Sequence, residues 1–211
     1  MRLNRLMFLI ATTVLLGAAA GVVTSLTGLW LHVPWFTGLI SGAFFSTTSL
    51  MGFWAYLTLN FIARVTLPQR VWRWAQMLIL ALVLYDMLYW RYHLHTAAGA
   101  DAGSFWSSFW QGLWPVFPAL AGAWAKRRLS GRGSFLPALF FLYVFTMLDS
   151  LPFIWFEYGS SQMGPLVNQT LLIMMICNLY LILIFGKLLS PAARPVETVD
   201  GPLPTRPDGV R

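Results

Sequence analysis

Long apolar runs separated by short polar stretches extend from the start of the chain to about residue 189. A helix needs about 20 apolar residues to cross roughly 30 Å of hydrocarbon, and most of these runs approach or exceed that length. The alternation of apolar and polar residues that marks a membrane β-barrel is absent. The pattern predicts an all-α, polytopic integral membrane protein with six transmembrane helices, at residues 6–29, 36–63, 71–90, 105–125, 135–156 and 165–189.

The basic residues are distributed very unevenly between the two sides of these predicted helices. If the N-terminus is cytoplasmic, all of the 14 lysines and arginines except Arg91 lie on the cytoplasmic side. This is the division that the positive-inside rule describes, and adding or removing one helix would destroy it. We therefore predict that both termini are cytoplasmic, and we interpret the net charge of +7 as a topology signal before any affinity for nucleic acid.

The two ends of the chain need separate interpretation. Arg2 and Arg5, followed by an apolar run and three alanines, could instead form a cleavable signal peptide. The apolar run continues past the alanines and its removal would leave five helices, so we favour a retained first helix. Residues 190–211 contain many prolines and few large apolar side chains, which predicts a disordered cytoplasmic tail.

Small and polar residues follow one face of the second predicted helix. In a membrane, helices associate through close packing of small residues and through hydrogen bonds, because lipid tails are as apolar as leucine side chains. We therefore expect the first two helices to pack near the centre of the bundle, and a homodimer interface along the same face is the alternative. The predicted packing face consists of Gly17, Gly21, Gly38, Gly42, Ser46, Ser49, Gly52, Tyr56 and Asn60.

Prolines and amides interrupt several of the apolar runs. Prolines inside a helix remove a backbone donor and clash with the preceding turn, so kinks are expected at Pro115, Pro118 and Pro152. Three amides lie in the inner halves of their predicted helices, and we interpret them as packing hydrogen bonds rather than as an ion path. These are Asn60, Gln76 and Asn178.

Two aspartates, Asp86 and Asp149, lie within the outer halves of the third and fifth predicted helices. A charged aspartate at the centre of a spanning helix costs about 2.5–3.5 kcal/mol, so both should face the bundle interior and have partners. Arg91 is the natural counter-ion. One interpretation is a functional polar cluster of Asp86, Arg91, Asp149 and Glu157 that binds a ligand or proton or acts as a switch; the other is hydrogen bonding that only fixes the packing.

No pattern of catalytic or metal-binding residues is present. The loops are too short for a soluble domain, and the sequence contains no HExxH, GxSxG or phosphate-binding glycine loop. His93 and His95 lack a third ligand at suitable spacing, and Cys177 is the single cysteine. We therefore expect no enzyme activity, no metal and no cofactor.

Two stretches resemble a known family. SLMGFWAYLTLNFIARVTLPQRVWRW, at residues 49–74, and RGSFLPALFFL, at residues 132–142, resemble the KbaA family of membrane proteins from spore-forming bacteria, which are named as activators of the KinB signalling pathway. The likeness covers about residues 1–189. It implies a multi-pass protein of the bacterial inner membrane that raises the activity of a sensor histidine kinase feeding the sporulation phosphorelay, and it implies no functional residues.

Two functions follow as hypotheses. In the first, the protein is a regulatory partner that binds a membrane histidine kinase through transmembrane faces or through the loops at residues 64–73 and 126–133. In the second, it is a small-molecule-binding or transport component whose outer polar cluster lines a pocket.

Overall fold

The computed structural model describes residues 3–28, 33–97, 109–110, 113–157 and 163–189. Helices and short turns or connections make up these ranges, which contain no strand, so the predicted all-α fold is confirmed for the described part of the chain. Four of the described helices are long and apolar enough to cross a membrane, namely Asn4–Thr27, Gln69–Tyr89, Phe135–Pro152 and Leu166–Gly186.

The helices follow the order of the predicted segments, with differences at their ends. The longer ones are α1 (Leu3–Thr27), α2 (Trp35–Thr66), α3 (Gln69–Ala97), α5 (Val116–Ser130) and α8 (Met163–Leu189). Between α5 and α8 the chain forms a 3-10 turn, η1 (Arg132–Ser134), and then α6 (Phe135–Phe140), a π-helical turn η2 (Phe141–Phe145) and α7 (Thr146–Glu157). Most of the N-terminal part of the predicted fourth helix and the predicted tail at 190–211 lie outside the described residues.

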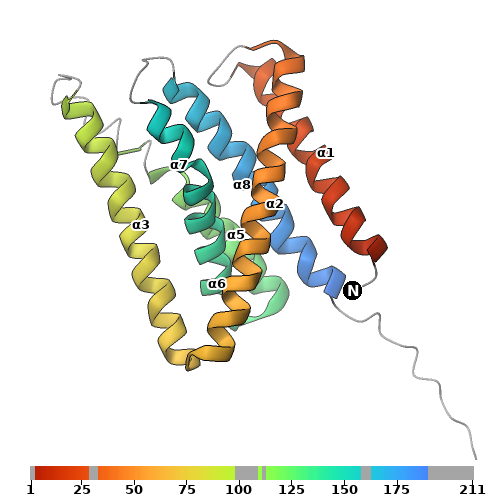
Figure 1. Ribbon diagram of the computed structural model, residues 1–211, viewed down its shortest axis with the longest axis vertical. Coiled ribbons are helices and arrows are strands. Elements are labelled where there is room, and N and C mark those ends of the chain that lie inside the picture. The colour runs from red at the N-terminus through yellow and green to blue at the C-terminus, as the bar shows by residue number, and fades with distance from the viewer. Residues whose placement is uncertain (1–2, 29–32, 98–108, 111–112, 158–162, 190–211) are drawn as a thin grey trace, which may run out of the picture.

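Successive helices run up and down the bundle (Figure 1). The first residues of α1, the turn between α2 and α3, the turn between α5 and α6, and the last residues of α8 all lie at the lower end of the view. The α1 and α2 helices lie side by side and make the most extensive helix contact in the described chain, whereas α3 lies at one side of the bundle. We call the lower end the basic end, because it holds Arg64, Arg70, Arg73 and Arg127.

Prolines shape the helices differently from our expectation. Pro115 occupies the N-cap of α5 and Pro118 falls in its first turn, where a missing backbone donor costs nothing, so neither kinks a continuous described helix. Pro152 does lie inside α7. The irregular backbone between α6 and α7 is the π-helical turn at Phe141–Phe145, which contains no proline and which the sequence did not predict.

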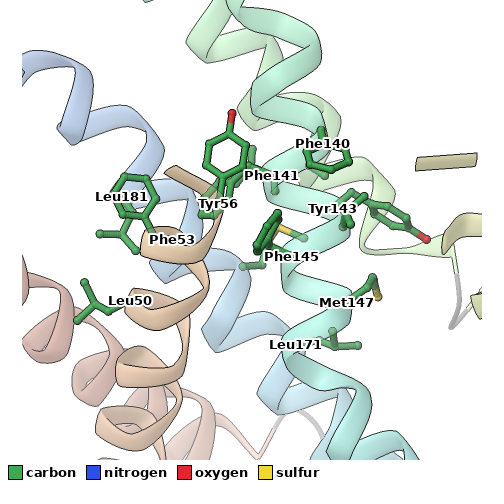
Figure 2. Close-up of a cluster of buried hydrophobic side chains, with 14 of the residues drawn as sticks. Leu50, Phe53, Tyr56, Phe140, Phe141, Tyr143, Phe145, Met147, Leu171 and Leu181 are labelled. Carbon is green, nitrogen blue, oxygen red and sulfur yellow. The ribbon is translucent and has the colours of Figure 1, made fainter. Parts of the chain in front are cut away.

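An aromatic core joins α2 to the α6–η2–α7 segment (Figure 2). The ring of Phe141 lies 5.4 Å from that of Phe53 and 4.8 Å from that of Tyr56, measured between centroids. The Tyr56 hydroxyl donates a hydrogen bond to the Pro137 carbonyl oxygen at 3.1 Å. Leu171 and Leu181 extend this core onto α8, so one face of the second half of α2 is buried against later helical segments.

Buried polar side chains form hydrogen bonds between α8 and its neighbouring helices. Gln169 Nε2 donates to Thr24 Oγ1 of α1 at 3.0 Å. Asn178 Nδ2 donates to Thr146 Oγ1 of α7 at 2.9 Å. A hydrogen bond within a protein contributes only about 0.5–1.5 kcal/mol to stability, so these two contacts chiefly determine which faces of α8 meet α1 and α7.

Candidate functional site

Glycines allow α1 and α2 to approach each other closely. A Cβ atom added at Gly17 would lie 2.7 Å from the carbonyl oxygen of Gly42, and one added at Gly42 would overlap the carbonyl oxygen of Gly17. One turn further along α1, a Cβ atom added at Gly21 would likewise overlap the carbonyl oxygen of Gly38. Both halves of this contact belong to a single chain, so α1 already covers the part of the α2 face that we considered for a homodimer.

The second half of the same α2 face contacts other helices. Gly52 lies against the carboxyl group of Asp149 on α7, and Tyr56 bonds to the carbonyl of Pro137. Asn60 Oδ1 accepts a hydrogen bond from the indole Nε1 of Trp72 on α3 at 3.2 Å. The α2 helix therefore contacts α1 with its first half and the α3, α6 and α7 helices with its second half.

Of the two acidic side chains that the structure describes, Asp149 faces the bundle interior. Its Oδ2 atom is buried and accepts no hydrogen bond within the described chain. A Cβ atom at position 52 would lie 2.5 Å from this oxygen, so only glycine leaves room for the carboxyl group. A buried polar atom without a partner is costly, and such atoms in native proteins usually mark a strained or functional position.

Asp86 differs from our expectation that it faces the interior, because the structure places it on the exposed surface of α3. The buried side of this helix carries Trp72, Gln76 and Met87, and Asp86 lies about 100° around the helix from Met87. Asp86 and Asp149 therefore do not share one buried cluster. The other two members of that cluster, Arg91 and Glu157, have side chains outside the described part of the structure.

The three amides that we interpreted as packing hydrogen bonds behave differently from one another. Asn60 and Asn178 each form an interhelical hydrogen bond. Gln76 is fully buried, yet neither its amide oxygen nor its amide nitrogen has a partner among the described residues. The sequence signal at this position is that Gln76 follows Arg70 by six residues and Arg73 by three.

The described residues offer helix contacts rather than an assembled chemical centre. No group of three or more His, Cys, Asp or Glu side chains in this part of the chain is arranged to hold a metal ion. The α2 helix contacts α1, α3, α8 and the α6–η2–α7 segment through glycines, aromatic rings and single hydrogen bonds.

Comparison with known proteins identifies the family of this bundle. The sequence profile of the KbaA family, described as KinB-signalling pathway activation in sporulation, matches residues 7–188. A KinB-signaling pathway activation protein from Bacillus subtilis (strain 168) is 28% identical over 158 residues, which are 72% of this chain and 73% of that protein. No solved structure matches the chain. Because the profile spans the bundle from α1 to α8, the chain belongs to the KbaA family.

Proposed function

We propose that the protein is a membrane-embedded regulator that activates a sensor histidine kinase pathway leading to the sporulation phosphorelay. The observation that carries this proposal is the family match over residues 7–188, which takes in nearly the whole helical bundle. The relative from Bacillus subtilis is named for activation of the KinB-signaling pathway, in keeping with a regulatory role for this chain.

The exposed side chains support membrane embedding. Trp74 and Leu78 on α3 are each 70% exposed, and Tyr85 on the same helix is 64% exposed. Soluble proteins rarely expose large continuous apolar surfaces, whereas lipid or a partner helix covers such surfaces in a membrane. The arginines at the basic end match the positive-inside rule if that end is cytoplasmic.

The exposed face of α3 is the best candidate for the kinase contact. Large apolar side chains recur on it at steps of three and four residues, which makes one continuous stripe along the helix. We call it the α3 stripe; it consists of Val71, Trp74, Leu78, Leu82, Tyr85 and Tyr89. Asp86 is exposed beside it, and an aspartate facing lipid is costly unless a partner hydrogen-bonds to it. A kinase transmembrane helix on the α3 stripe would supply that partner.

The second hypothesis, a small-molecule-binding or transport component with an outer polar pocket, no longer has the observation on which it depended. It required Asp86 and Asp149 to line one polar pocket, but Asp86 is exposed and Asp149 packs against Gly52. No observation in the described part of the chain places these two acids in a common pocket.

Photocrosslinking in cells tests the proposal. A photoreactive amino acid would replace Leu78, Leu82 or Tyr85 on the α3 stripe, and Met87, which is 7% exposed on the opposite side, would be the matched control. We expect a kinase adduct from the stripe and none from Met87. Deletion of the gene should also lower phosphorelay output, but only while the kinase is present. The proposal would be wrong if no exposed position of the bundle gave a kinase adduct and deletion left the output unchanged.

A further inference from the structure

A cavity of about 700 Å³ opens at the basic end of the bundle. It lies between the turn that joins α2 to α3 and the turn that joins α5 to α6, two segments that are far apart in the sequence. Four arginines line it, namely Arg64 from α2, Arg70 and Arg73 from α3, and Arg127 from α5. None of the described residues lining this cavity is acidic, so it concentrates positive charge from three helices.

This concentration of positive charge favours the binding of an anion in the cavity. The side chains of all four arginines are exposed, and their mutual repulsion falls when a negative group lies between them. Guanidinium groups bind phosphate through two parallel hydrogen bonds, and basic pockets between membrane helices on the cytoplasmic side bind lipid headgroups. Arginines that served only to set topology would not need to converge on one cavity.

Gln76 provides an independent reason to expect a ligand. It lines the cavity, it is fully buried, and both atoms of its amide lack a hydrogen-bond partner in the described chain. It lies seven residues after Gln69, about 10 Å deeper along α3. The neighbouring Trp72 already donates its indole N–H to Asn60, so its hydrogen-bonding capacity is used, whereas that of the buried Gln76 amide is not. Its amide offers one acceptor and donors, which suits a ligand that carries a hydroxyl group as well as phosphate oxygens.

One wall of the cavity is apolar. Trp74 and Met77 on α3 are exposed there, and the half-buried Phe135 and Leu136 of α6 lie on the other side. A basic rim, an amide inside and an apolar wall together match an amphiphile whose headgroup enters the cavity and whose acyl chains run along the helices.

We propose that this cavity binds a phosphate ester that also carries a hydroxyl group, and that an anionic phospholipid headgroup such as that of phosphatidylglycerol is its source. The arginines bind the phosphate, and the amide of Gln76, which is fully buried, hydrogen-bonds to the headgroup when the side chains that cover it move aside. The inference does not depend on the proposed kinase contact, because it concerns a ligand of this chain alone.

The experiment measures lipid retention and thermal unfolding of the purified full-length protein. One set of nanodiscs contains phosphatidylglycerol and the other only phosphatidylcholine, and glycerol 1-phosphate or inorganic phosphate is added as a soluble competitor. The test variants are Arg70→Gln with Arg73→Gln, and Gln76→Leu. The matched control is Arg5→Gln with Arg128→Gln, which removes the same charge outside the cavity; Arg128 stacks on Trp124 with its guanidinium carbon 4.2 Å from the ring centroid.

We expect phosphatidylglycerol, but not phosphatidylcholine, to be retained by the wild-type protein and to raise its unfolding temperature. The double arginine variant should weaken retention by about tenfold or more, since it removes charge-assisted hydrogen bonds. Gln76→Leu should unfold no earlier than wild type without lipid, because it removes an unpartnered amide, yet it should lose much of the stabilisation by lipid.

The outcomes separate the possible sources of the ligand. Retention of phosphatidylglycerol that soluble phosphate esters do not reverse assigns the site to a lipid headgroup. If glycerol 1-phosphate or inorganic phosphate displaces the lipid at low concentration, the cavity is still an anion site, but its ligand is a free phosphate compound. Equal weakening in the control and cavity variants, or no preference for phosphatidylglycerol, overturns the proposal and leaves only general attraction between charges. If lipid stabilises Gln76→Leu as much as it stabilises the wild-type protein, the proposed hydrogen bond from the Gln76 amide to the headgroup is wrong.

Discussion

A methyl group added at Gly52 would collide with the carboxyl group of Asp149. In Gly52→Ala the new Cβ atom would lie 2.5 Å from Oδ2, 3.0 Å from Oδ1 and 3.1 Å from Cγ of Asp149. The carboxylate cannot simply turn away, because its Oδ2 atom is already enclosed. The α2 and α7 helices must therefore separate, or Asp149 must take a strained rotamer.

The size of the effect follows from two opposing terms. Inserting a carbon atom into a packed interior costs about 1–3 kcal/mol. Replacing glycine by alanine inside a helix stabilises the folded state by about 0.5–1 kcal/mol. We therefore expect Gly52→Ala to lower the free energy of unfolding by about 1 kcal/mol, and by no more than about 2.5 kcal/mol.

The assay is unfolding of the purified protein by SDS in mixed micelles, followed by tryptophan fluorescence. Gly133→Ala is the matched control, because nothing lies within 4 Å of a Cβ atom at that position. It should change the free energy by no more than about 0.5 kcal/mol. Asp149→Ala in the Gly52→Ala background should recover most of the loss, because it removes the atoms that collide.

Two results would refute this reasoning. One is a Gly52→Ala protein as stable as Gly133→Ala, which would mean that α2 and α7 are not in contact here. The other is strict additivity of Gly52→Ala and Asp149→Ala in the double-mutant cycle, since residues in contact should show a coupling of about 0.5 kcal/mol or more.

Three further predictions use the same unfolding assay. Gly42→Ala should cost more than Gly52→Ala and resist rescue by any side-chain change, because the obstacle is the backbone carbonyl of Gly17; a smaller loss would contradict the α1–α2 contact. Tyr56→Phe should lower the free energy of unfolding by about 1 kcal/mol through loss of the bond to Pro137, and an unchanged value would show that this bond contributes nothing. Asp86→Leu should leave stability within about 0.5 kcal/mol because the residue is exposed, while lowering phosphorelay output if the α3 stripe binds the kinase; a large stability loss would place Asp86 inside the bundle.

Two residues of α3 show which structural features could not be predicted from the sequence. Every predicted segment was long and apolar, but apolarity on all sides of a helix does not reveal which side faces other helices. Asp86 and Gln76 lie ten residues apart on α3, and from the sequence we expected both side chains to be buried and to have a partner. One proved exposed and the other buried without a partner among the described residues, because packing against α6 and η2 selects the inner face of α3.

The sequence by itself determined the all-α class, the apolar segments and the family resemblance, because helix length, apolarity and local motifs are properties of neighbouring residues. It also showed the periodic glycines and the arginine groups at residues 64–73 and 126–133. Only the tertiary structure decided that Gly52 meets Asp149, that the backbone forms a π-helical turn at Phe141–Phe145, and that arginines from three helices surround one cavity. These features depend on the rotation and spacing of helices distant in sequence, which side-chain packing across the whole bundle determines.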